Sequence, residues 1–297
     1  MKKVFFIIVL VLSAASLFAQ NVSDFEIQGN DDGTMTILNY KGLAKDIVIP
    51  ETIFNMPVSR LREGAFKSKG LTSVVIPASV TFIGDETFRG NQLSSVTIPQ
   101  TVEYIGNYAF AGNQLTNITI PGKVITIGNF AFAGNRLTSI TIPDSVTFIG
   151  SSAFEGNSLT NVIIGNGVVY IGNYAFTCYN NNVSSNNTNQ ITNVTLGNSI
   201  KYIGSNAFYY HRITAIVIPD NVVFIGAYAF APRNQNTLTN IKIGKYVMFG
   251  VDNNYYYDES NTTAAFNNNG NFDRIYQNMD KRAGTYTFAN GNWSYAP

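Results

Sequence analysis

The sequence repeats itself every 22 residues, and this period constrains the fold more than any other feature. Residues 134–155 read GNRLTSITIPDSVTFIGSSAFE, and residues 156–177 read GNSLTNVIIGNGVVYIGNYAFT. The shared pattern is Leu-Thr-x-Ile-x-Ile-Pro, then Val-x-x-Ile-Gly, then Ala-Phe. Its last residue recurs as Phe66, Phe88, Phe110, Phe132, Phe154, Phe176, Phe208 and Phe230. A fixed period of this length, with variable polar positions, is typical of a solenoid in which each repeat forms one coil and stacks on the next.

The Leu-Thr-x-Ile-x-Ile-Pro segments predict one short strand per coil. They alternate apolar and polar residues, they are rich in β-branched side chains, and proline ends most of them. Because the residues between two such strands are too many for a hairpin, successive strands should run parallel, about 4.8 Å apart. We therefore predict a right-handed repeat solenoid with a parallel β-sheet on its concave face, little helix, and a cap at each end. The marker phenylalanine and the recurrent Leu, Ile and Val should fill the interior.

Two further residue types recur where the chain must turn. A glycine follows the inner isoleucine of each coil, as at Gly128 and Gly150, and glycine allows either a positive φ or a close approach of another backbone. An asparagine stands two residues before the strand in the coils with Asn91, Asn113, Asn135 and Asn157. These asparagines either form a hydrogen-bonded ladder between coils or simply favour a turn.

The pattern divides the chain into four segments. Residues 1–19 combine Lys2 and Lys3, a short apolar run and small residues, which is the order of a cleavable signal peptide and too short a run for a membrane span. Residues 20–60 predict an N-terminal cap with a hairpin at Asp32-Gly33. The repeats occupy residues 61–244, with an asparagine-rich insertion at 178–189. Residues 245–297 predict a C-terminal cap with a short helix and a hairpin, in which we interpret Trp293 as a packing residue.

Charge and cysteine content exclude several classes of function. Charged residues make up 12% of the chain, about half of the usual ~25%. Without residues 1–19 the chain has 17 basic and 18 acidic residues, a net charge of −1. Nucleic acid is therefore not an expected partner, since phosphate binding needs a basic stripe. Cys178 is the single cysteine, so an exported chain would have no intrachain disulfide.

The residue combinations of enzymes and metal sites are also missing. His211 is the single histidine; no motif gives it a nucleophile or an orienting carboxylate, and we interpret it as a surface residue. Cys178, in the insertion, is either a free thiol or an intermolecular bridge. Asp252, Asp258 and Glu259 could ligate calcium, but their spacing matches no known loop, and we interpret them as solvated. We therefore predict no catalytic activity, no cofactor and no bound metal.

The outward residues of the strands form the candidate partner-binding surface. They are hydroxyl-rich and nearly uncharged, and they should pave the concave sheet. The candidate residues are Ser95, Thr97, Asn117, Thr119, Ser139, Thr141, Asn161, Ile163, Asn193 and Thr195. A serine or threonine also follows the leading apolar residue of each strand, either as a structural ladder, which we favour, or as an edge of this surface.

A row of aromatic residues precedes the Ile-Gly pair. The row comprises Phe82, Tyr104, Phe148, Tyr170, Tyr202 and Phe224, with Thr126 in the place of one ring. Such a row either anchors proteins or sugars or covers the back of the coil. We favour the second interpretation, although the spacing does not fix the direction of the rings.

The repeats resemble those of the BspA-type leucine-rich-repeat surface proteins of anaerobic and host-associated bacteria. The residues that carry the resemblance are GNQLTNITIP, VTFIGSSAF and their copies between Arg60 and Gly244. The tail GTYTFANGNWSYAP is similar to that of treponemal members. The resemblance implies a leucine-rich-repeat solenoid, display outside the cell, and attachment to host matrix proteins, host cells or other bacteria.

These observations predict an exported leucine-rich-repeat binding protein, an adhesin or surface antigen, located at the cell surface, secreted or periplasmic. The expected partner is a protein, with a glycan as a second choice, and no transmembrane segment is expected after signal removal. The alternative is a carbohydrate-binding or structural cell-envelope solenoid, which the Tyr and Asn content would suit. A hydrolase would require His211 or paired carboxylates to act in catalysis and is the least favoured class.

Overall fold

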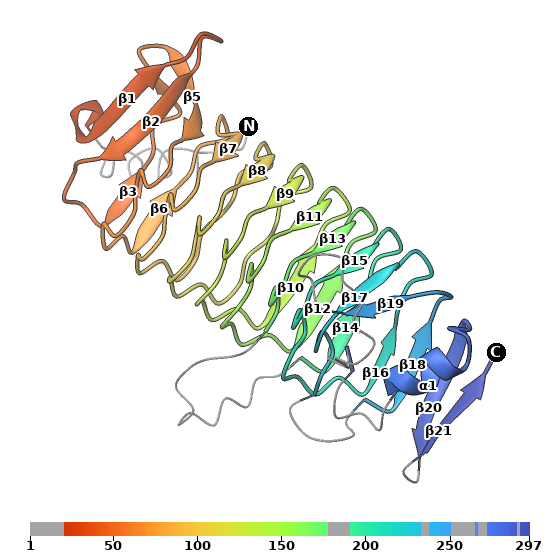
Figure 1. Ribbon diagram of the computed structural model, residues 1–297. Helices are drawn as coiled ribbons and strands as arrows, with labels where there is room; N and C mark the ends of the chain where they lie inside the picture. The colour runs from red at the N-terminus through yellow and green to blue at the C-terminus, as the bar shows by residue number, and fades with distance from the viewer. Residues whose placement is uncertain (1–20, 178–190, 233–237, 251–264, 267–271, 290–291) are drawn as a thin grey trace, which may run out of the picture.

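The coils of the repeat stack along one axis to form an elongated solenoid (Figure 1). The computed structural model describes residues 21–177, 191–232, 238–250, 265–266, 272–289 and 292–297. The expected signal peptide, the insertion with Cys178 and the acidic segment from Asp252 to Glu259 lie outside these residues. The repeat-solenoid class that the 22-residue period predicts is confirmed by the parallel stacking of the strands.

One sheet runs the whole length of the solenoid, and we call it the long sheet. Its strands are β1 (Phe25–Gly29), β2 (Met35–Tyr40), β4 (Thr52–Ile53), β5 (Met56–Leu61), β7 (Phe82–Ile83), β8 (Tyr104–Ile105), β9 (Thr126–Ile127), β11 (Phe148–Ile149), β13 (Tyr170–Ile171), β15 (Tyr202–Ile203), β17 (Phe224–Gly226) and β19 (Met248–Gly250). From β5 to β19 every neighbouring pair is parallel and in register. The long sheet is therefore built from the Ile-Gly segments.

The Leu-Thr segments form shorter sheets on another side of the coil, which we call the short-strand face. β3 (Asp46–Val48) pairs with β6 (Ser73–Val75), and β12 (Asn161–Ile164) lies between β10 (Ser139–Ile142) and β14 (Asn193–Thr195). β16 (Ala215–Val217) pairs with β18 (Asn240–Ile243). Among the described residues, no strand forms at 94–98 or 116–120, and no backbone hydrogen bond joins these segments to a neighbouring coil. The prediction that the Leu-Thr strands make one continuous sheet is therefore wrong.

The glycine of the Ile-Gly pair explains why the coils stay in register on the long-sheet side. Gly150 does not have a positive φ; instead, a Cβ placed on it would lie 2.5 Å from the backbone nitrogen of Asn129 in the preceding coil. Only glycine permits such a close approach. Of the two roles that the sequence left open for this glycine, the close approach of another backbone is therefore the correct one. Positive φ occurs elsewhere in the coil, at Gly134 (65°) and at the non-glycine residues Tyr108 and Phe130 (both 56°).

The marker phenylalanines fill the centre of the solenoid, as predicted. All eight are at most 2% exposed, and each ring stacks on the ring of the next coil with centroids 5.0–5.4 Å apart. Tyr40 continues the stack at one end, 5.9 Å from Phe66, and Phe266 continues it at the other, 5.3 Å from Phe230. Phe266 lies beyond Gly244, where we expected the repeats to end. Its spacing of 36 residues from Phe230 departs from the regular period, which is why the sequence pattern did not show this coil.

The recurrent asparagines form a buried hydrogen-bonded ladder. Asn135 is 6% exposed; its Nδ2 donates to the carbonyls of Phe110 and Phe132, both at 3.0 Å, and its Oδ1 accepts from the N–H of Leu115 at 3.1 Å. Asn91, Asn113 and Asn157 make the same bonds in their coils. Each asparagine thus ties its own coil to the preceding one. Of the two interpretations from the sequence, the hydrogen-bonded ladder is therefore the correct one.

Replacing Asn135 with alanine is expected to lower the free energy of unfolding by about 1–3 kcal/mol, because the change leaves buried backbone groups without partners. Denaturant unfolding of the chain lacking residues 1–19, followed by circular dichroism, measures the effect. The matched control is Asn117→Ala, since Asn117 is exposed on the short-strand face. Equal losses in the two variants would contradict the ladder.

Both ends of the solenoid are covered. At the N-terminus the 3-10 turn η1 (Val22–Asp24) leads into β1 and β2, which pair antiparallel and join the long sheet through β5. At the C-terminus, α1 (Phe272–Asn278) packs with the hairpin β20 (Gly284–Ala289) and β21 (Asn292–Ala296), and β20 pairs antiparallel with β18. Trp293 lies 5.0 Å from Phe272 and 5.3 Å from Phe288, ring centroid to ring centroid, so it contributes to packing. No helix within the described ranges is long and apolar enough to cross a membrane.

Candidate functional site

The structure places the candidate partner-binding residues together on the short-strand face. All of them are exposed except Asn161, which is half-buried. Their neighbours in the strands, such as Ile140 and Val162, are at most 2% exposed and point into the core. Ser139, Asn161 and Asn193 lie opposite one another in adjacent coils. The face is therefore a regular surface of hydroxyl, amide and methyl groups.

The short-strand face is open in the coils at 94–98 and 116–120. Four of the candidate residues lie there, namely Ser95, Thr97, Asn117 and Thr119. Val96 and Ile118 between them are only partly buried, whereas Ile140 at the same register is 2% exposed. No backbone hydrogen bond joins these two segments to an adjacent coil, so the coils are less tightly tied to one another here than at β10 and β12. The sequence pattern does not predict this difference between coils.

The serine and threonine row beside this face is structural in the coils where strands form. The hydroxyl of Thr160 donates to the carbonyl of Thr138 at 3.2 Å, and Thr192 and Thr239 repeat the bond at 3.4 and 3.3 Å. At the N-terminal end the Thr72 hydroxyl donates to the Asp46 carboxylate at 2.6 Å. The ladder interpretation therefore describes these residues.

The aromatic row lies on the outer side of the long sheet, partly exposed. Phe82 and Tyr104 stack with centroids 4.7 Å apart and planes at 5°, and Phe148 and Tyr170 stack at 5.2 Å and 5°. The exposed fraction is 37% for Phe148. Thr126 separates the two pairs, and Tyr170 and Tyr202 are tilted by 43° with centroids 6.4 Å apart. The row is therefore a set of short stacks rather than the continuous carbohydrate platform that the alternative function would use.

His211 is buried, and the prediction of a surface histidine is wrong. It is 2% exposed; its Nδ1 lies 3.3 Å from the N–H of Ile191, and its Nε2 lies 2.7 Å from the carbonyl of Phe176. Nδ1 must accept and Nε2 must donate, so the ring is neutral, and burial lowers its pKa to about 4. His211 follows Phe208 by three residues, as Asn91 follows Phe88. This offset could have revealed that the histidine takes the place of the ladder asparagine.

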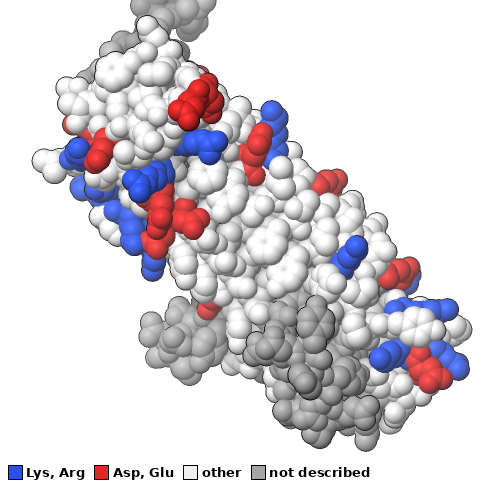
Figure 2. Space-filling model, turned by 45° about the horizontal axis from the view of Figure 1, so that its top comes forward, with Lys and Arg blue, Asp and Glu red and all other residues white. Residues whose placement is uncertain are grey.

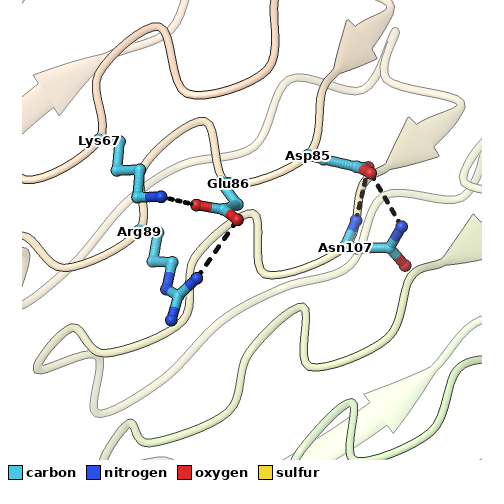
Figure 3. Close-up of polar contacts among 5 residues, drawn as sticks. All are labelled: Lys67, Asp85, Glu86, Arg89 and Asn107. Atoms are coloured by element: carbon cyan, nitrogen blue, oxygen red, sulfur yellow. Dashed lines mark hydrogen bonds and ion pairs between the residues drawn. The ribbon is translucent and has the colours of Figure 1, made fainter.

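A shallow groove of about 460 Å³ lies at the turn that follows the long-sheet strands, and we call it the corner groove. Its floor and walls carry the carboxylates of Glu63, Asp85 and Glu86 and the polar residues Asn107, Asn129 and Ser151. Two stacked rings, Tyr108 and Phe130, complete the lining. Figure 3 shows the ion pairs of Glu86 with Lys67 and Arg89 beside the bonds of Asp85 to Asn107. None of these residues was among the candidates from the sequence.

The family model of the BspA-type leucine-rich repeat region matches six copies over residues 59–183 and 181–292. This match covers most of the chain. The chain belongs to the BspA-type leucine-rich-repeat family. The resemblance seen in the repeats is thereby confirmed, and the matched region continues past Gly244 into the part that holds Phe266.

Solved structures of other bacterial proteins share the fold of this BspA-type protein. A leucine-rich repeat protein from Bacteroides ovatus ATCC 8483 is 21% identical, with a TM-score of 0.55, over 85% of this chain and 69% of that one. The leucine-rich repeat protein of T. pallidum is 23% identical, with a TM-score of 0.53, over 64% of this chain and 88% of that one. No curated protein matches the chain.

Charge on this BspA-type protein is uneven. On the face drawn in Figure 2, charged residues gather toward the N-terminal end and at the C-terminal cap, and only isolated ones lie between. Contacts through the middle of this face would therefore rely mainly on hydrogen bonds and shape.

Within the described part of the chain, no group of three or more His, Cys, Asp or Glu side chains is placed to hold a metal ion.

Proposed function

We propose that this BspA-type protein is an exported adhesin or surface antigen that uses the short-strand face to attach to a host matrix protein, a host cell or another bacterium. The observation that carries the proposal is the row of exposed, uncharged hydroxyl and amide side chains on that face, which includes Ser95, Thr97, Asn117 and Thr119. The signal-like residues 1–19 support export. Solenoids commonly use such extended surfaces for binding.

The chemistry of the face favours a protein partner with its own hydrogen-bonding groups. The exposed hydroxyl and amide side chains of the face can both donate to and accept from the backbone and polar groups of a polypeptide. The candidate residues carry no charge, so electrostatic steering contributes little, and binding should depend only weakly on salt.

Thr119→Arg and Thr141→Arg are each expected to weaken binding about tenfold or more, because a long charged side chain would hold the partner away from the face. Surface plasmon resonance with a panel of host matrix proteins and with whole host and bacterial cells measures the loss. The matched control is Thr147→Arg: Thr147 is exposed in the segment leading into β11 of the long sheet and lies away from the proposed interface. If the panel and the cells show no binding, or if the control weakens it equally, the proposal fails.

A further inference from the structure

The corner groove is a second candidate site, separate from the short-strand face. Its polar positions Glu63, Asp85, Asn107, Asn129 and Ser151 come from five successive coils, so the groove extends for roughly 19 Å along the solenoid at the usual strand spacing. Its volume of about 460 Å³ lies within the range of small-ligand sites. A groove of this shape suits a chain-like ligand better than a compact one.

Most of the negative charge in the groove is already compensated. Glu86 forms ion pairs with Lys67 and with Arg89, the latter at 3.3 Å, and the hydrogen bond from Lys67 holds the pKa of Glu86 below its usual value. Asp85 accepts from the backbone N–H of Asn107 at 2.8 Å and from its side-chain Nδ2 at 2.9 Å. Glu63 has no such partner among the described residues. The groove therefore repels anions yet offers a cation only one unpaired carboxylate.

The groove also retains free hydrogen-bonding groups. The Oδ1 of Asn129 accepts from the N–H of Ser151 at 2.8 Å, which leaves its Nδ2 without a partner in the described part of the chain. The same holds for the hydroxyl of Tyr108 and the carboxylate of Glu63. One acceptor, one donor and one hydroxyl group that can do both therefore remain in the groove, and these groups suit a ligand with hydroxyl groups.

One aromatic face borders these polar groups. Tyr108 and Phe130 stack at 4.6 Å with planes at 3°, and the guanidinium of Arg89 covers the other side of Tyr108 at 4.7 Å. In the next coil the same register holds Ser152, so the second face of Phe130 has no stacked ring. An apolar ring face beside amide, hydroxyl and carboxylate groups matches the apolar C–H face and the hydroxyl edge of a sugar ring.

We propose that the corner groove binds a neutral oligosaccharide. The unpaired carboxylate of Glu63 disfavours acidic sugars, the length suits several linked units, and Phe130 provides the stacking face. A lysine- or arginine-rich peptide fits less well, because Glu63 is the single carboxylate without a partner in the described lining. This site is independent of the proposed protein attachment through the short-strand face.

The first test is an array of neutral, sialylated and sulfated oligosaccharides, together with lysine- and arginine-rich peptides, probed with the purified chain lacking residues 1–19. Binding to neutral oligosaccharides is expected. The strongest neutral hit is then measured by isothermal titration calorimetry. Binding confined to acidic glycans or to basic peptides, or to nothing on the array, would overturn the proposal.

The second test uses Phe130→Ser, which should weaken binding of that hit about tenfold or more. Serine already occupies this register at Ser152 with φ 55°, close to the 56° of Phe130, so the fold should be retained, as thermal unfolding will show. Tyr174→Ser is the matched control, since Tyr174 has the same register (φ 59°) but lies outside the groove. Equal losses in the two variants would overturn the site. Thr119→Arg should leave glycan binding unchanged, so failure here is distinguishable from failure of the adhesin proposal.

Discussion

Replacing Phe154 with alanine is expected to lower the free energy of unfolding by about 3–5 kcal/mol. Phe154 is fully buried, and its ring stacks between Phe132 at 5.4 Å and Phe176 at 5.3 Å. The variant loses both ring contacts and leaves a cavity in the middle of the stack, where the coils on either side are held apart by their own side chains. Denaturant unfolding of the chain lacking residues 1–19 measures the loss.

The control for this experiment is Phe148→Ala in the same coil. Phe148 also stacks on a neighbouring ring, but 37% of it is exposed on the long sheet, so its replacement should cost much less. Hydrogen exchange of the neighbouring coils, measured alongside, will show whether a solenoid with this defect still unfolds as one unit. A loss near zero for Phe154→Ala, or equal losses in the two variants, would contradict the assignment of the marker phenylalanines to the core.

Stability is expected to fall by up to about 3 kcal/mol between pH 6.5 and pH 4 because of His211 alone. The histidine has a pKa of about 4 in the folded chain against an ordinary value of 6.5, so the unfolded chain takes up the proton first. Its contribution is therefore complete above pH 6.5 and is lost as the pH falls toward 4. The physical reason is that protonated Nδ1 can no longer accept from the N–H of Ile191.

His211→Asn is the matched variant, because asparagine occupies this place in the ladder at Asn91, Asn113, Asn135 and Asn157. Carboxylates whose pKa values are lowered in the folded chain, such as Asp32 and Glu86, also stabilise the fold less in acid. This loss is the same in both proteins. The difference between the two unfolding curves, recorded from pH 7.5 to pH 4, isolates the histidine. Parallel curves would show that His211 does not titrate as its burial requires.

The solenoid and its interior could be predicted from the sequence because they depend on one period. A residue such as Phe154 meets Phe132 and Phe176 only if each coil has the same length, so equal spacing implies stacking. The path of the long sheet could not be predicted in the same way. Only the Leu-Thr segments alternate apolar and polar residues, so the sequence favours them as the main sheet. The actual path depends on how closely the backbone packs against residues such as Gly150, which is a property of the assembled coils.

The candidate sites show the same division. The exposure of residues such as Thr119 follows from strand alternation. The lack of inter-coil backbone hydrogen bonds beside Thr119 and the presence of the corner groove could not be predicted in this way, because each depends on contacts between coils. The burial of His211 could have been predicted, since it follows Phe208 by three residues, as Asn91 follows Phe88. The incorrect prediction of a surface residue relied on the polar character of histidine rather than on its position in the repeat.

The left-handed turn that holds Phe130 recurs with φ of 54–59° in successive coils, and it carries Glu86, Tyr108, Phe130, Ser152, Tyr174, Asn206 and Tyr228. Residues with acidic, aromatic and small side chains thus adopt the same backbone conformation, which the stacked coils hold in place. The residue at this turn can therefore change without altering the scaffold. One rigid framework can in this way acquire new specificities one coil at a time, much as antibody loops vary on a constant sandwich.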